Sequence, residues 1–203
     1  MRDTHFVPTV ICSKSKDLFQ VIKSLREKVW RQEGAFIDPT EKRNMISDEN
    51  DLSAFHYSVI IEGKLAAAAR LSLHNTPASL PDSHLLADFM HQFEFPIASF
   101  NRMVVDPNFR GLRLPHLLDL ARLQTLTSLE AKAAVTMAVT KRVRSMGEIG
   151  FKLIGKVQKS DEFMKSVTTD FHCLQYSQSN SPLPANNSWR YPAIFDLPEA
   201  ERP

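Results

Sequence analysis

One stretch near the middle of the chain restricts the fold more than any other. Residues 103–123 read MVVDPNFRGLRLPHLLDLARL. The apolar start predicts a strand, Pro107 a turn, and the leucine-rich end an amphipathic helix with Pro115 in its first turn, where a missing N–H costs nothing. Such a junction directs backbone N–H groups and the positive end of a helix dipole to one spot outside the strand. The stretch therefore predicts a phosphate or pyrophosphate site.

The ligand contacts expected at this junction come from the end of the strand and from the loop that leads into the helix. A plain core strand is the alternative for Met103–Val105, and a solvated basic face is the alternative for the nearby basic run Lys141–Arg144 alone. The expected contacts are Met103, Val104, Val105, Arg110, Gly111, Leu112, Arg113, Leu114, Pro115 and His116.

Size and composition are those of a globular chain. With 203 residues, 43% of them hydrophobic, the chain can form one domain over residues 1–179, followed by a tail rich in proline, serine and asparagine over 180–203. The net charge of +2 is too balanced to favour nucleic acid. Cys12 and Cys173 are expected to be reduced and buried, and the histidines lack zinc spacing. No bound metal is expected, because the histidines lack this spacing. We find no signal peptide or membrane span, so a cytoplasmic location is expected.

Hydrophobic periodicity predicts alternating strands and helices. An acidic loop is expected over residues 35–54. The order predicts an α/β (α+β) fold with a mixed sheet and helices packed on it. Strands are expected over 5–13, 55–61, 65–73, 95–105, 133–140, 153–157 and 168–177, and helices over 15–33, 84–92, 114–123 and 141–151.

This order resembles that of the GNAT acyltransferase superfamily over about residues 55–160. Val105, Pro107, Arg110 and Gly111 match its pyrophosphate loop, and EIGFKLIG (148–155) matches a later motif. The resemblance implies a mostly antiparallel central sheet with a splayed strand pair, and helices on both faces. It also implies acetyl-CoA, a longer acyl-CoA or an acyl-phosphopantetheine carrier as a co-substrate, with no permanently bound cofactor.

The sequence departs from the superfamily at two places. Arg113 and Pro115 replace small residues of the loop, and Arg113 can offer its guanidinium to the same phosphate. Met146, with Ser145 beside it, stands where the superfamily often has a catalytic tyrosine. These departures favour chemistry other than ordinary acetyl transfer with a tyrosine acid.

The N-terminal half has a narrower resemblance, to autoinducer synthases and long-chain N-acyl amino acid synthases. It rests on LREKVW, the acidic loop, AARLSL and SFNRMVV. Ser99 stands where autoinducer synthases have a glutamate, so the catalytic base stays open. The resemblance implies site roles for Arg26, Trp30, Asp48, Asp51, Arg70 and Arg102.

The arginines are expected to bind an amino-acid carboxylate or to organise the acidic loop. Arg70, which lies among alanines, needs a partner because an unpaired buried charge is costly. Asp48 and Asp51 would pair with the arginines or recognise an amine, and a purely structural ion-pair network is the alternative. Trp30, Ser99 and Ser145 are expected to contact substrate, with core packing as the alternative for Trp30.

The leading hypothesis is an N-acyltransferase that moves an acyl group from acyl-CoA or acyl carrier protein to a primary amine, such as that of an amino acid. Backbone N–H groups near residues 103–105 would polarise the thioester carbonyl. A non-catalytic acyl-carrier-binding regulator is the first alternative. A nucleic-acid-binding module using Lys141–Arg144 is the second, and no nucleic-acid partner is expected. Oligomeric state, donor and acyl length stay open.

Overall fold

A computed structural model describes residues 9–34, 46–160, 168–177 and 193–196. The strands form one sheet in the order β6-β7-β5-β4-β3-β2-β1-β8. They are β1 (Thr9–Ser13), β2 (Phe55–Ile61), β3 (Lys64–His74), β4 (Ile97–Val105), β5 (Ala133–Val139), β6 (Lys152–Ser160), β7 (Thr168–Ser177) and β8 (Ala193–Asp196). The α-helices are α1 (Lys16–Gln32), α2 (Leu114–Leu126) and α3 (Thr140–Glu148).

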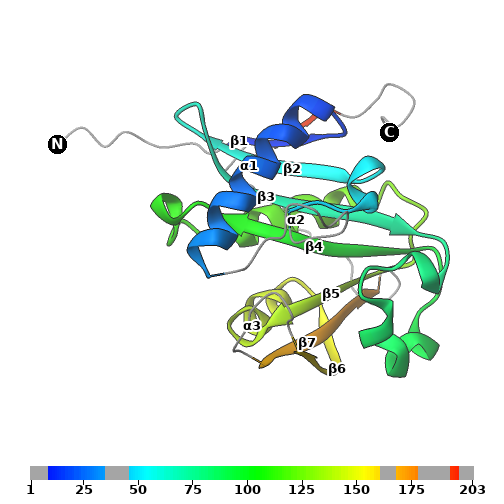
Figure 1. The fold of residues 1–203 in the computed structure, drawn as a ribbon. Coiled ribbons are helices and arrows are strands. Elements are labelled where there is room, and N and C mark those ends of the chain that lie inside the picture. The colour runs from blue at the N-terminus through cyan, green and yellow to red at the C-terminus, as the bar shows by residue number, and fades with distance from the viewer. Residues whose placement is uncertain (1–8, 35–45, 161–167, 178–192, 197–203) are drawn as a thin grey trace.

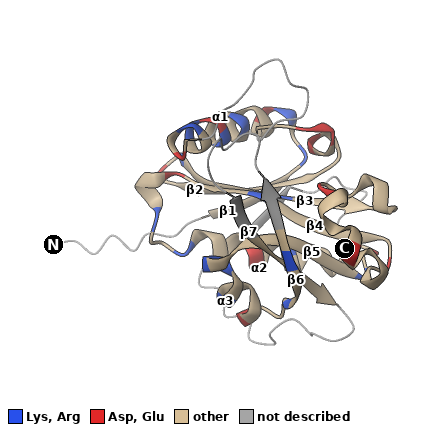
Figure 2. Ribbon diagram, turned by 60° about the horizontal axis from the view of Figure 1, so that its bottom comes forward, with Lys and Arg blue, Asp and Glu red and all other residues tan. Residues whose placement is uncertain are grey.

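The sheet lies between two helical layers. α1 covers one face, while α2 and α3 lie against the other (Figures 1 and 2). The pairs β1–β8 and β4–β5 are parallel, and the other neighbouring pairs are antiparallel. In Figure 2 the charged residues gather on α1 and α3, and the strands are largely uncharged. The predicted fold class, a mixed and mostly antiparallel sheet with helices on both faces, is confirmed.

The alanine run of β3 explains how close both helical layers come to the sheet. Successive side chains of a strand point to opposite faces. Ala68 packs with Ile22 and Val29 of α1, whereas Ala67 and Ala69 belong to the core that α2 completes. Small side chains at the centre of the sheet therefore let helices on both faces pack against its backbone.

Two irregularities of β4 open the sheet at its centre. β4 pairs with β5 only over Ile97–Ser99, so the two strands diverge beyond that point. On the other side, the register of β3 and β4 shifts between Ala68 and Arg70, and Arg102 takes a φ of 55°. A non-glycine residue rarely adopts this left-handed conformation, and a bulge disturbs the ladder of hydrogen bonds around it. The predicted splayed strand pair is confirmed.

The structure changes some of the predicted elements. Residues 83–92 form a 3-10 helix, Ser83–Gln92, where a short helix was expected over 84–92, and the central strand begins at Ile97. Within the expected tail, Ala193–Asp196 pairs with β1 and extends the sheet. Residues 5–8 and 35–45, together with 180–192 and 197–203, lie outside the described residues.

The cysteines and the hydrophobicity of the helices can be described from the structure. Cys12 and Cys173 are buried and free of disulfide bonds, as predicted. Among the described residues, no helix is both long and apolar enough to cross a membrane.

Candidate functional site

The end of the acidic loop is held over the sheet by buried arginines. Asp48 caps the 3-10 helix Glu49–Leu52, and its carboxylate accepts hydrogen bonds from Arg70 Nη1 and Nη2 at 2.5 and 3.1 Å. Arg70 Nη1 also lies 3.0 Å from Asp51 Oδ1. The prediction that Arg70 needs a partner is therefore confirmed, and the partners come from the loop.

A second arginine, from α1, completes this attachment. Arg26 Nη1 donates to Asp51 Oδ1 at 3.0 Å and to the backbone oxygen of Ile46 at 2.9 Å. Burial lowers the pKa of Arg26 to about 10, which still leaves the guanidinium charged at neutral pH. Burial alone would raise the pKa of Asp51, but the charges of Arg26 and Arg70 outweigh it and hold that pKa below its usual range.

Arg102 brings a third guanidinium to the same carboxylates. Its Nη2 donates to Asp48 Oδ2 at 2.6 Å. Arg70 and Arg102 together outweigh the effect of burial and hold the pKa of Asp48 well below its usual range. Three guanidinium groups thus face two carboxylates, and Arg102 is the most exposed of the three. Its guanidinium also lies 5.6 Å from the centre of the Trp30 ring. We call these five residues (Arg26, Asp48, Asp51, Arg70 and Arg102) the acceptor cluster, after the role in binding an acceptor amino acid that the resemblance to autoinducer synthases implies for them.

Hydrogen bonds continue from Arg70 along β4. Arg70 Nε donates to Asn101 Oδ1 at 2.7 Å, and Asn101 Nδ2 donates to Ser99 Oγ at 3.0 Å. Ser99 Oγ lies 2.8 Å from Nε2 of His74. Burial lowers the pKa of His74 to about 4, so its ring is neutral near pH 7. The ring nitrogen of His74 and the amide of Asn101 therefore hold the Ser99 hydroxyl from two sides by hydrogen bonds.

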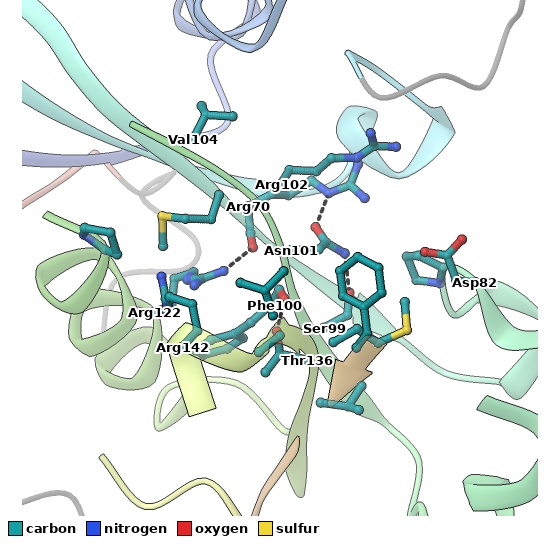
Figure 3. Close-up of a pocket in the computed structure, with 18 of the residues that line it drawn as sticks. Arg70, Asp82, Ser99, Phe100, Asn101, Arg102, Val104, Arg122, Thr136 and Arg142 are labelled. Atoms are coloured by element: carbon teal, nitrogen blue, oxygen red, sulfur yellow. Dashed lines mark hydrogen bonds between the residues drawn. The ribbon is translucent and has the colours of Figure 1, made fainter. Parts of the chain in front are cut away.

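A cavity of about 1070 Å³ connects the acceptor cluster with the strand–loop–helix junction. Its wall includes Trp30, Ser99 and Met103–Val105. The junction contributes residues 110–115 to the same cavity. Figure 3 shows Arg70, Asn101 and Arg102 on one side of β4, and Arg122, Thr136 and Arg142 on the other. The cavity therefore passes the opening between β4 and β5.

The junction has the geometry that the sequence predicts. Gly111 has a φ of 85°, and Arg113, the residue before α2, has a φ of 57°. No side chain caps α2 at its N-terminus, so the N–H of Leu114 is not used by a cap. Pro115 has no N–H, and the N–H of His116 donates to the backbone oxygen of Arg113 at 3.1 Å. Arg110 is half-exposed and its Nη2 lies 2.5 Å from Glu33 Oε1. An anion at this corner would compete with Glu33 for Arg110.

Not every predicted contact reaches the cavity. Four predicted site residues in the described part of the chain do not line it: His116, Ser145, and the buried pair Arg26 and Asp51. His116 is part-buried in the first turn of α2, one residue beyond Pro115. Ser145 donates a hydrogen bond to the backbone oxygen of Arg142 at 3.0 Å within α3. Met146, its neighbour, lines the cavity instead.

Sequence reasoning missed several polar residues of this site. Asn101 and His74 become visible only when β3 and β4 are paired in register. Thr136, which donates to the backbone oxygen of Phe100 at 2.7 Å where the strands part, lies in a segment that reads as an ordinary strand. Arg122 and Asp119 lie among the leucines of α2, and an arginine beside an aspartate within an apolar helix face was the signal available for them.

The buried histidine predicts how stability depends on pH. An unfolded histidine has a pKa of about 6.5, so the unfolded chain binds a proton on His74 more readily than the folded chain does. The free energy of unfolding should therefore be fully retained above about pH 6.5 and should decrease as pH falls from about 6.5 to 4. His74→Gln should flatten this slope in denaturant titrations at several pH values.

Two features make this measurement specific. Burial also lowers the pKa of His56, so part of the slope should persist in His74→Gln. His84→Gln, at an exposed position, should leave the slope unchanged. An unaltered slope in His74→Gln would show that His74 titrates alike in the folded and unfolded chains.

Comparisons with known proteins give a consistent result for the fold. No protein-family model and no curated protein matches the sequence. Among solved structures, the polyamine N-acetyltransferase of Drosophila melanogaster, which forms N-acetylagmatine, aligns with a TM-score of 0.63 and 13% identity over 83% of this chain and 99% of its own.

Two further structures come from enzymes with other acyl products. FeeM, an N-acyl amino acid synthase from uncultured soil microbes, aligns with a TM-score of 0.61 and 11% identity, over 86% of this chain and 93% of its own. The CoA-dependent acyl-homoserine lactone synthase MesI aligns with a TM-score of 0.58 and 16% identity, over 85% of this chain and 90% of its own. At such identities the likeness concerns the fold, and the chain has the fold of GNAT N-acetyltransferases.

Proposed function

We propose that this chain is an N-acyltransferase that moves an acyl group from a phosphopantetheine thioester to a primary amine on a molecule that also has a carboxylate. The observation that carries the proposal is the single cavity that joins an uncapped helix N-terminus with basic loop residues to the acceptor cluster. The fold shared with N-acetyltransferases and with acyl amino acid and acyl-homoserine lactone synthases supports it.

The charges of the acceptor cluster indicate how a carboxylated amine would bind. The acceptor cluster has one guanidinium more than it has carboxylates, and Arg102 lines the cavity beside Trp30. A carboxylate on the acceptor would neutralise that surplus and accept charge-assisted hydrogen bonds. The amine of the same molecule can then lie toward Ser99, whose hydroxyl is held by His74 and Asn101.

The junction at residues 110–115 and the bulge of β4 indicate how the phosphopantetheine thioester would bind. The phosphate of CoA or of a carrier protein would lie on the amides of residues 111–114, with the guanidiniums of Arg110 and Arg113 beside it. From there the pantetheine would follow the edge of β4 where β5 diverges. The thioester would then reach the bulge at Arg102, where the ladder of backbone hydrogen bonds is interrupted.

The reaction that fits this placement is direct aminolysis. The neutral amine nitrogen forms a bond to the thioester carbon, backbone N–H groups near residues 103–105 stabilise the oxyanion, and the C–S bond then breaks. The proton lost by the nitrogen ends on the departing thiolate, so the products are an amide and a free thiol. No covalent enzyme intermediate is required.

The donor site can be tested by equilibrium binding of CoA. Arg110→Ala and Arg113→Ala should each weaken binding by about tenfold, because each removes a charge-assisted contact to phosphate. Arg31→Ala, a change of an exposed arginine on α1, is the matched control and should leave binding unchanged. Glu33→Gln, which releases Arg110 from its ion pair, should not weaken binding. Equal affinities for all variants would contradict the donor site.

The reaction itself is tested by incubating the protein with labelled acyl-CoA, acyl carrier protein and a pool of amino acids and decarboxylated amines. Mass spectrometry should detect amides of carboxylated amines. Ser99 stands where the autoinducer synthases that this sequence resembles have a glutamate, and Met146 stands where the GNAT superfamily often has a tyrosine. These two differences favour the alternative of a binder without turnover. Tight binding of the thioester without any product would support that alternative.

A further inference from the structure

A second charged cluster lies on the opposite side of β4 from the acceptor cluster. Asp119 of α2 accepts hydrogen bonds from Arg122 of the same helix and from Arg142 of α3. Arg122 is buried, donates to the backbone oxygen of Arg70 at 3.0 Å, and lies 4.3 Å from the centre of the Phe100 ring. We call Asp119, Arg122 and Arg142 the floor cluster.

The floor cluster holds two guanidinium groups and one carboxylate. Asp119 pairs with both arginines and leaves one surplus positive charge. The buried Nε of each arginine has no hydrogen-bond partner among the described residues, and both side chains line the cavity. Arg122 is buried, whereas Arg142 keeps 19% of its side chain exposed. Arg142 is therefore the arginine that a ligand in the cavity reaches more readily.

The surroundings of Arg142 strengthen this positive potential. Arg142 lies in the first turn of α3, which no side chain caps at its N-terminus, and the helix dipole adds positive potential there. On this side of the sheet the cavity lining includes Ala138 and Met146, which belong to the core that α2 completes. It also includes Thr136, whose hydroxyl donates to the backbone oxygen of Phe100. A ligand on this side of the sheet thus meets mostly hydrocarbon beside the cation.

This composition does not suit a plain hydrocarbon chain. An alkyl chain that reached the floor would cover Arg142 and remove water from a cluster that has one more guanidinium than carboxylates, which is costly. A chain ending in a carboxylate would neutralise the surplus charge and pair with the planar guanidinium. The acceptor cluster also has one more guanidinium than carboxylates, so each side of the opening in the sheet has one surplus positive charge.

We propose that the floor cluster is a subsite for the far end of the donor's acyl group, and that it selects acyl groups with a terminal carboxylate. The inference rests on the proposed function, in which the junction binds the phosphate of the carrier and the acceptor cluster binds the carboxylate of the amine. The floor cluster is then left for the acyl end of the thioester. The substrate class is then a thioester of a dicarboxylic acid. Arg142 is its specificity-determining residue.

The test compares thioesters that differ only at the far end of the chain. Succinyl-, glutaryl- and adipyl-CoA are paired with butyryl-, pentanoyl- and hexanoyl-CoA, and dissociation constants are measured without acceptor for the full chain. At least one carboxylated thioester should bind about tenfold or more tightly than its chain-matched partner, the size expected for a charge-assisted hydrogen bond. Arg142→Gln should remove most of this preference.

Arg144→Gln is the matched control. Arg144 lies on the same helix, is 93% exposed and pairs with Glu148, so this variant should keep the full preference. The inference is overturned if the wild-type chain shows no preference, or if Arg142→Gln keeps it. It is also overturned if Arg142→Gln weakens CoA and every thioester equally, because Arg142 would then hold the carrier. If no thioester binds at all, the proposed function itself fails, which distinguishes the two failures.

Discussion

Arg70→Ala is expected to lower the free energy of unfolding by about 3–5 kcal/mol, the cost typical of removing one partner from a buried ion pair. Arg70 is fully buried and holds Asp48, Asp51 and Asn101 at once. Without it, two carboxylates stay buried with fewer positive partners, and the loop end at residues 46–54 loses its main attachment to β3. Chemical denaturation at pH 7 measures the loss.

Two further variants make the Arg70 result specific. Arg31→Ala removes an exposed ion pair with Glu27 and should cost less than about 1 kcal/mol. Arg70→Lys keeps the charge without the planar fork that reaches several oxygens, so its loss should fall between the other two. If Arg70→Ala costs no more than Arg31→Ala, the cluster does not contribute to stability in the way described.

Arg102→Ala is expected to reduce kcat/KM toward a carboxylated amine by about 10- to 100-fold, the equivalent of one charge-assisted hydrogen bond. The acceptor identified in the acylation assay is used, and the loss should appear mainly in KM because the carboxylate lies away from the reacting nitrogen. Asp48 keeps Arg70 as a partner in this variant, so folding should be much less affected than in Arg70→Ala.

A second acceptor, in which a carboxamide replaces the carboxylate, serves as the control. It shows whether Arg102 acts by binding the carboxylate of the acceptor or by organising the site. The wild-type chain should use this neutral acceptor poorly, and Arg102→Ala should add little further loss. An equal loss for both acceptors would place Arg102 in the organisation of the loop rather than at the carboxylate. Arg31→Ala should match the wild-type chain with either acceptor.

Local patterns in the sequence predicted most of the elements that surround the site. The spacing of Leu25 and Val29 on α1, the Glu62-Gly63 turn between β2 and β3, and Pro115 in the first turn of α2 are short-range signals, and each element lies where they indicate. The alanines of β3 are a further local signal, because small side chains are favoured where two layers approach one strand.

Longer-range features depended on the assembled sheet. The pairing of Ala193–Asp196 with β1 joins segments from the two ends of the described chain, and no local pattern in a short segment specifies its distant neighbour. The hydrogen bonds from Arg70 through Asn101 to Ser99 and His74 need the register of β3 against β4. A shift of one residue would turn these side chains to the opposite face.

The sequence by itself determined the order of the elements and the strand–loop–helix junction, because these depend on residue type and short spacing. The arginines and aspartates of the acceptor cluster were indicated by the resemblance to autoinducer synthases. Tertiary structure decided which charges meet. It placed Arg142 of α3 against Asp119 of α2, opened β4 from β5, and joined both charged clusters and the junction in one cavity. The net charge at each end of that cavity depends on contacts between distant segments, and only the folded chain brings those segments together.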